Sequence, residues 1–254
     1  MSQFTCIQSR REGDIEYLVL NRPDVRNAFN EELIAEVTSW VRGATLDVKT
    51  RAVVISGAGA AFCAGADLGW MAKMATYTWD DNVRDARAAA AMFEAIDTLP
   101  VPVIARVHGA SLGGGAGLAA VADIVLAEAG TTFGFTEVKL GLIPAIIAPY
   151  VLAKIGPSHA RELFLTGRRF NAEYAREIGL VHAVVAADQL DATVQKYLDE
   201  ILANGRGAMA AAKTLLREIS IRSVTDAMPA TTAAIAERRA SNEAQERIRA
   251  FLKK

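Results

Sequence analysis

A short apolar run that is followed, five residues later, by three consecutive glycines is the feature that most limits how this chain can fold. Residues 102–107 are rich in apolar β-branched side chains, which predicts a buried strand rather than a helix. Gly113, Gly114 and Gly115 follow, and residues 117–121 continue in small side chains that suit a helix. Because this turn carries no Cβ atoms, its backbone N–H groups can approach a ligand closely. Together with the helix dipole, they predict a site for a phosphate or for an oxygen that becomes negative during a reaction.

Strands and helices alternate along the first part of the chain. Asn30 is a good N-cap for a helix whose apolar residues recur at helical spacing. A second helix is predicted over residues 80–99, where Pro100 and Pro102 end it. Strands are predicted at residues 15–20, 51–56, 102–107 and 123–127. This alternation indicates βαβ units with crossover connections.

Beyond Pro144 the pattern becomes mostly helical. Residues 146–155 are apolar on nearly every side, which predicts a buried segment, and a helix restarts at Ser158. Further helices are predicted over residues 172–178 after an N-cap at Asn171, and over residues 189–202, 208–219, 224–239 and 242–251. We therefore expect an α/β chain with one large core over residues 1–187 and a helical region over residues 188–254.

The bulk composition excludes several classes of function. Hydrophobic residues make up 52% of the chain and charged residues 22%, a globular balance, and the net charge of -1 offers nucleic acid no basic face. Cys6 and Cys63, like the three histidines His108, His159 and His182, show no metal-binding spacing. We find neither a signal peptide nor an apolar run of the ~18 residues that a membrane span needs. The expectation is a cytoplasmic protein with no metal, no nucleic-acid partner and no membrane association.

Glu137 is the candidate for proton transfer. It lies between a strand-like segment at residues 132–134 and an apolar run at residues 140–147. A carboxylate close to Lys139 can also be an ordinary surface group, so the residue alone does not decide the matter. Our central prediction is that the glycine turn holds an oxyanion and that Glu137 moves the proton.

Residues 109–113 also fit the Gly-x-Ser-x-Gly spelling of a hydrolase nucleophile, centred on Ser111. Asp123 with His159 or His182 could nominally complete a catalytic triad in the required order. We favour this esterase interpretation least, because the glycines continue beyond Gly113 and the other motifs would stay unexplained.

Several separated stretches together resemble the enoyl-CoA hydratase/isomerase (crotonase) superfamily. The resemblance covers essentially the whole chain and rests on residues 20–29, 62–68, 113–124, 135–144 and 251–254. Any one of these motifs is weak, but their order and spacing make the combination specific. The sequence of residues 65–71 and 142–145 is most similar to that of bacterial members described as methylglutaconyl-CoA hydratase-like.

This resemblance implies a crotonase-like spiral of ββα units with a C-terminal helical oligomerisation region, assembled as a homotrimer or homohexamer. It implies an acyl-CoA thioester as substrate and no separate cofactor, because coenzyme A is part of the substrate. The thioester oxygen would accept hydrogen bonds from the backbone N–H groups of Ala66 and Gly114, with Glu137 as acid and base. Fixed amides stabilise an enolate oxygen without reorganising, and one such donor is typically worth about 2.7 to 4 kcal/mol.

The resemblance also assigns residues that bind the two ends of the substrate. For coenzyme A these residues are Arg26, Ala28, Ala64, Asp67, Leu68, Phe251 and Lys254. For the acyl pocket they are Trp70, Met71 and Gly117, with Tyr77 as a further candidate. Each of them also has an ordinary structural interpretation, as a solvated cation, a helix end or a core side chain.

One position departs from the family pattern. Family hydratases commonly carry two glutamates, and the first of these positions is Gly117 in this chain. A single carboxyl can in principle deprotonate the water and then protonate Cα, so hydration with Glu137 alone is the favoured interpretation. The alternative is a Δ3,Δ2-enoyl-CoA isomerase, which would use a lone Glu137, and a non-catalytic CoA-binding member is the less favoured third possibility.

Overall fold

The computed structural model describes residues 4–253, apart from the side chains of residues 45 and 46, and is built around two sheets. In the described chain, the larger sheet has six strands in the order β1 (Ile7–Glu12), β2 (Ile15–Leu20), β3 (Ala52–Gly57), β4 (Val103–Val107), β6 (Ile124–Glu128) and β9 (Ala183–Val185). All neighbouring strands in it are parallel except β1 and β2. The smaller sheet contains β5 (Ala110–Leu112), β7 (Thr132–Gly134) and β8 (Arg169–Asn171).

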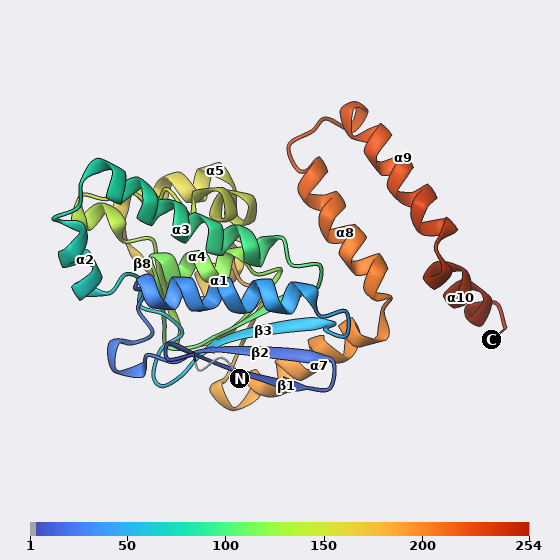
Figure 1. The fold of residues 1–254 in the computed structure, drawn as a ribbon, viewed down its shortest axis with the longest axis horizontal. Coiled ribbons are helices and arrows are strands. Elements are labelled where there is room, and N and C mark those ends of the chain that lie inside the picture. The colour runs from blue at the N-terminus through green and yellow to red at the C-terminus, as the bar shows by residue number, and fades with distance from the viewer. Residues whose placement is uncertain (1–3, 254) are drawn as a thin grey trace.

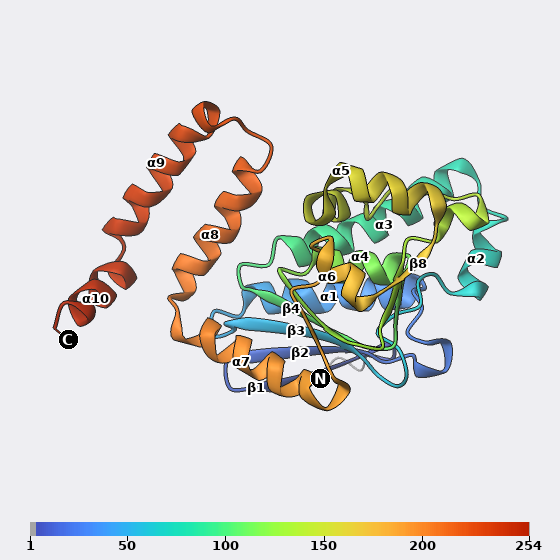
Figure 2. The same cartoon turned by 180° about the vertical axis from the view of Figure 1, so that it is seen from behind.

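Helices cover both faces of the larger sheet (Figures 1 and 2). One face and the smaller sheet share a large core with α1 (Glu31–Leu46), α3 (Trp79–Asp97), α4 (Gly114–Val121), α5 (Ala148–Thr166) and α6 (Ala172–Glu177). The opposite face packs against α7 (Leu190–Ala203) in a second, smaller core. Short elements complete the chain: η1 (Pro23–Val25), α2 (Leu68–Met74), η2 (Glu137–Leu140) and η3 (Ala187–Gln189).

The predicted alternation of strands and helices is confirmed, and so are two of its caps. The Asn30 side chain accepts a hydrogen bond from the Leu33 N–H at 2.9 Å, and Asn171 accepts one from the Tyr174 N–H at 2.9 Å. One detail differs from the prediction. The segment at residues 146–155 is only partly buried, because Leu152 remains 44% exposed on α5. The predicted restart of a helix at Ser158 agrees with a kink in α5 at Gly156, where φ is +69° and the backbone is not helical.

Three helices extend away from the core as an arm, which Figure 1 shows in orange and red. The arm consists of α8 (Arg206–Ile219), α9 (Val224–Ala240) and α10 (Asn242–Phe251), and Ala227 is its only buried residue in the described chain. An ion pair of 2.7 Å between Lys213 and Asp123 ties α8 to the core. The helical region predicted from residue 188 therefore includes one helix, α7, that packs on the sheet. None of the helices within residues 4–253 combines the length and apolar content needed to cross a membrane.

Candidate active site

Two glycine turns lie against each other at the start of α4. The backbone of Cys63 pairs with β5 through two hydrogen bonds of 3.0 Å, to Ala110 and Leu112, which aligns residues 63–66 with the glycine turn. A Cβ added to Gly113 would lie 3.8 Å from the Gly65 Cα, and both glycines have positive φ. The two turns are thus fixed by strand pairing and by close backbone contact.

Among the backbone N–H groups of these turns, those of Ala66 and Gly114 have no acceptor within residues 4–253. The residues on either side of Ala66 are held, because Gly65 accepts from and Asp67 donates to the Phe29 backbone, at 2.7 and 2.8 Å. Gly114 is the first residue of α4, where a helix leaves its N–H groups without intrahelical partners. Two unpaired donors on adjoining turns form a site for an oxygen that carries negative charge.

Glycine is required around these donors because neighbouring groups approach the backbone. A Cβ on Gly114 would lie 2.8 Å from the Phe29 ring, and one on Gly115 would lie 2.3 Å from the Cys63 carbonyl oxygen. Burial raises the pKa of the Cys63 thiol to about 12, so this cysteine stays protonated and acts as packing.

Glu137 begins η2 directly beside the glycine turn. A Cβ on Gly113 would lie 3.3 Å from its Oε1, and its Oε2 is buried without a hydrogen-bond partner in the described chain. Burial raises the pKa of this carboxyl, against a lowering by a hydrogen bond from its own backbone. A largely buried carboxyl with a raised pKa, next to unpaired N–H donors, has the properties of a general acid and base.

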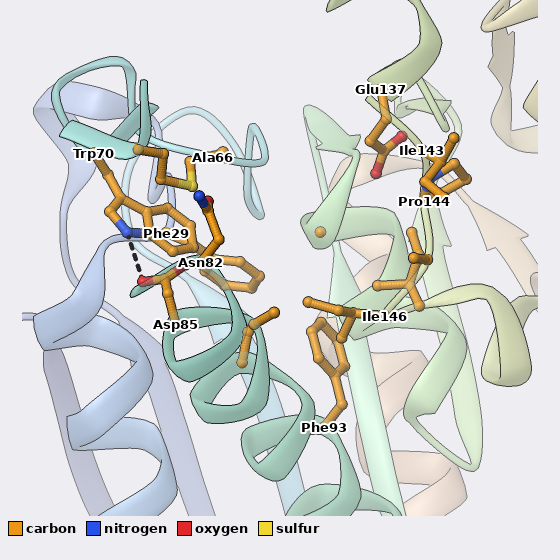
Figure 3. Close-up of a pocket in the computed structure, with 16 residues that line it drawn as sticks. Phe29, Ala66, Trp70, Asn82, Asp85, Phe93, Glu137, Ile143, Pro144 and Ile146 are labelled. Carbon is orange, nitrogen blue, oxygen red and sulfur yellow. Dashed lines mark hydrogen bonds between the residues drawn. The ribbon is translucent and has the colours of Figure 1, made fainter. Parts of the chain in front are cut away.

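A cavity of about 300 Å³ extends from these groups between α2 and α3 on one side and residues 143–147 on the other (Figure 3). Its lining is mostly apolar and comprises Phe29, Ala66, Trp70, Met74, Asn82, Asp85, Ala86, Ala89, Phe93, Gly114, Glu137, Ile143, Pro144, Ala145, Ile146 and Ile147. The carboxyl of Glu137 points into the space between the two walls.

Three of the residues proposed for the acyl pocket, Met71, Gly117 and Tyr77, do not line this cavity. Met71 is absent from the lining and Met74, one turn further along α2, takes that place, whereas Trp70 lines the cavity as predicted. Gly117 is covered by Ile147, whose Cγ2 lies 2.1 Å from where a Cβ on residue 117 would stand. Tyr77 donates its hydroxyl to Glu31 at 3.3 Å and is likewise absent from the lining.

A second pocket of about 640 Å³ adjoins the first, with Ala66 in the lining of both. Five of the residues predicted to bind coenzyme A line it: Arg26, Ala28, Ala64, Asp67 and Leu68. The sequence analysis missed Arg169 on β8, which brings a second cation to this pocket from a distant part of the chain. Neither Arg26 nor Arg169 forms an ion pair with any described residue.

Buried Asn27 shapes the loop that carries Arg26 and Ala28. Its side chain accepts from the Arg22 N–H and donates to the carbonyl oxygens of Ala58 and Ala61, each at 2.8 Å. Arg22 in turn pairs with Asp67 at 2.9 Å. Although burial raises the pKa of Asp67, the amides of Trp70 and Gly69 and the Arg22 guanidinium together bring it below the ordinary value.

Phe251, the other predicted CoA residue that the structure describes, does not reach this pocket in its own chain. It lies on α10 in the arm, 76% exposed and far from α2 (Figure 1). Lys254 lies outside the described residues.

The structure contradicts the esterase interpretation. Ser111 lies inside β5, fully buried, and its hydroxyl has no hydrogen-bond partner within the described chain. Of the two candidate histidines, His182 instead accepts from the Val125 N–H at 3.0 Å, and the His159 ring lies edge-on to Tyr174 with ring centroids 6.4 Å apart. A nucleophile requires an exposed turn and an adjacent base, and Ser111 has neither.

Among the described residues, Cys6, Glu32 and Glu36 form one group spaced closely enough to hold a metal ion. Glu36 already accepts hydrogen bonds from the backbone N–H groups of Thr5, Cys6 and Ile7. Burial raises the pKa of the Cys6 thiol, which disfavours the thiolate that a metal needs. This group therefore anchors the start of β1 to α1.

Comparison with known proteins gives the same picture as the geometry. A sequence model of the enoyl-CoA hydratase/isomerase family matches residues 10–254. The chain is 32% identical to a crotonyl-CoA hydratase from Syntrophomonas wolfei, over 96% of this chain and 94% of that protein. Crystal structures of enoyl-CoA hydratases from Shewanella pealeana and Mycobacterium smegmatis superpose with TM-scores of 0.96 and 0.94. The Shewanella protein is 35% identical, and the match covers 99% of this chain and 94% of that protein. The Mycobacterium protein is 30% identical, and the match covers 98% of this chain and 96% of that protein.

Fold and site define a protein of the crotonase superfamily. The chain belongs to the enoyl-CoA hydratase/isomerase family, which confirms the resemblance inferred from the sequence motifs.

Proposed function

We propose that this protein hydrates the 2,3 double bond of an enoyl-CoA thioester, with Glu137 as the only carboxyl that moves protons. The observation that carries the proposal is the buried, unpartnered Oε2 of Glu137 beside a turn whose Gly114 N–H has no acceptor in the described chain. The named hydratases among its relatives support it.

The proposed reaction begins with the thioester oxygen between the N–H groups of Ala66 and Gly114. Ionised Glu137 takes a proton from water as the water oxygen bonds to Cβ, and the electron pair of the double bond moves onto the thioester oxygen. The two amides stabilise this enolate. Protonated Glu137 then gives its proton to Cα, which restores the carbonyl and the ionised carboxyl.

The two adjoining pockets suggest how the substrate would lie. The acyl group would occupy the apolar cavity, and coenzyme A would pass Ala66 into the second pocket. There Arg26 and Arg169, without ion-pair partners in the described chain, suit a phosphate of coenzyme A. The exposed Phe251 and the rest of the arm fit a role in assembly, as the homotrimer or homohexamer that the family resemblance implies.

A second candidate is double-bond isomerisation, and the contact between Ile147 and Gly117 favours it. No side chain extends from position 117, and apolar Ile147 stands where a water-holding carboxylate would be. In this reaction Glu137 would take a proton from Cα of a 3-enoyl-CoA and return it to the γ carbon, through the same stabilised enolate.

Assays with two thioesters separate these functions. Loss of the enone absorbance of crotonyl-CoA reports hydration, and formation of that absorbance from a 3-enoyl-CoA reports isomerisation. Hydration that disappears in Glu137→Gln supports the main proposal. Isomerisation without hydration overturns it in favour of the second candidate, and CoA binding without either reaction leaves only a binding protein.

A further inference from the structure

The apolar cavity has one polar wall, formed by Asp85 and Asn82 on α3 with Trp70 on α2 (Figure 3). The Trp70 indole N–H donates to Asp85 Oδ1 at 3.1 Å. The Asn82 amide nitrogen lies 3.0 Å from the Thr78 carbonyl oxygen, to which it donates. The wall therefore has both of its side-chain donor groups already directed at protein oxygens.

The groups that remain on this wall are acceptors. Within residues 4–253, neither Asp85 Oδ2 nor Asn82 Oδ1 receives a hydrogen bond, and Asp85 forms no ion pair. Burial raises the pKa of Asp85, the Trp70 bond opposes this, and the negative charge of Glu31 raises it further. The nearby cation Lys73 pairs with Glu31 instead, at 3.2 Å. An ionised Asp85 is thus left without a counter-charge.

We propose that this wall selects acyl chains that carry a hydroxyl group toward their far end and rejects those that end in a carboxylate. This inference rests on the proposed function, because it assigns the apolar cavity to the acyl group. A hydroxyl supplies a donor to Asp85 Oδ2, which has none within the described chain, whereas a methyl group would desolvate that oxygen without compensation. A carboxylate adds like charge and brings no donor. The wall therefore argues against dicarboxylic substrates of the methylglutaconyl type, although residues 65–71 and 142–145 resemble the sequences of methylglutaconyl-CoA hydratase-like proteins.

Binding of saturated thioesters tests the inference independently of catalysis. Saturated acyl-CoA esters of graded length are prepared with a terminal methyl, hydroxyl or carboxylate group, and their Kd values are measured by calorimetry. At the length that binds tightest, we expect the hydroxyl ester to bind at least about tenfold more tightly than the methyl ester, equivalent to about 1.4 kcal/mol. The carboxylate ester should bind weakest.

Three variants assign the effect to Asp85. Asp85→Leu should reverse the order of the methyl and hydroxyl esters, and Asp85→Asn should improve carboxylate binding at least about tenfold by removing like charge. Asp80→Asn removes the same charge from an exposed position of α3 outside the cavity and should leave the order unchanged. Melting temperatures of the variants establish that each has folded.

The outcomes separate this inference from the proposed reaction. Equal binding of methyl and hydroxyl esters at every length, or tightest binding of the carboxylate, overturns the inference even if crotonyl-CoA is hydrated. The expected order without hydration overturns the reaction and leaves the inference standing. If none of the thioesters binds, both are overturned.

Discussion

Ile147 occupies the space into which a side chain at position 117 would extend, since a Cβ on Gly117 would lie 2.1 Å from Ile147 Cγ2. Gly117, on α4, supplies no carboxylate, and Ile147, in the loop before α5, leaves no room for one at that position. A single substitution at either position does not restore the two-carboxylate arrangement.

The first prediction follows from this contact. Gly117→Glu alone should destabilise the fold by about 1 to 3 kcal/mol through overpacking, and Gly117→Ala by a similar amount. Adding Ile147→Ala to Gly117→Glu should recover most of the loss and raise kcat for crotonyl-CoA hydration above that of Ile147→Ala alone. Denaturant unfolding and the hydration assay measure the two effects. Additive losses in the double variant would show that the two side chains do not compete for one space.

The second prediction concerns the role of Glu137 in catalysis. Glu137→Gln should lower kcat by about 10²- to 10⁴-fold, the usual contribution of a general acid and base, with little change in acyl-CoA affinity. In the wild type, kcat should rise as pH passes through a value above the ordinary pKa of glutamate, because the base must be ionised and burial raises its pKa. A kcat that does not change with pH above the ordinary pKa of glutamate, or full activity of Glu137→Gln, contradicts the role of Glu137 as general base.

The third prediction concerns stability and pH at the same residue. Because the pKa of Glu137 is raised in the folded state, the folded chain keeps this proton where the unfolded chain has released it. The stability that this carboxyl contributes is therefore present at low pH and is lost as pH rises through the raised pKa. Glu137→Gln should therefore melt above the wild type at mildly alkaline pH, and the difference should shrink in acid. A difference that is constant with pH would rule this out.

The fourth prediction concerns Asn27, which has a left-handed backbone with φ of +56° and a fully buried side chain. Asn27→Ala loses three hydrogen bonds and tolerates this backbone poorly, so it should cost more than about 2 kcal/mol and raise KM for acyl-CoA. Asn27→Gly keeps the backbone free to adopt this conformation and removes only the side chain. The Asn27→Gly variant should therefore melt at a higher temperature than Asn27→Ala, and both should show a raised KM. An unchanged KM in both variants would show that this loop does not contribute to CoA binding.

The fifth prediction concerns the arm. Ile221, which follows α8, and Val224, the first residue of α9, are 95% and 87% exposed. If the arm contacts further copies of the chain, sedimentation velocity should show a trimer or hexamer, and Ile221→Asp with Val224→Asp should shift it toward monomer. A wild-type chain that sediments as a monomer at micromolar concentration would contradict the proposed assembly.

Local signals predicted much of this fold. Asn30 and Asn171 each start a helix through a side-chain hydrogen bond to a nearby N–H, so the sequence alone locates them. The buried strand at residues 102–107 follows from its apolar run, and the structure has β4 there. The short helix α2 was not predicted, although Asp67 caps it through Gly69 and Trp70, because its seven residues depend on tertiary contacts.

Contacts between residues far apart in the sequence are the part of the site that could not be predicted. The motifs identified the two glycine turns and Glu137, and the structure places them together. Nothing near Gly117 in the sequence indicates that Ile147 covers it, and nothing near residue 26 indicates Arg169. Asp85 lies in an alanine-rich helix with no local feature of a binding residue, and only the pairing of α2 with α3 shows where it faces.

Both proposed enolate donors belong to the main chain, and this has a consequence for how such proteins diversify. Substitutions along the cavity walls can exchange one acyl preference for another while the polarising amides stay in place, since no side chain supplies them. Main-chain groups therefore serve the chemistry, whereas side chains determine substrate selectivity. A few substitutions on α2 and α3 can change the preferred acyl group without removing the enolate donors.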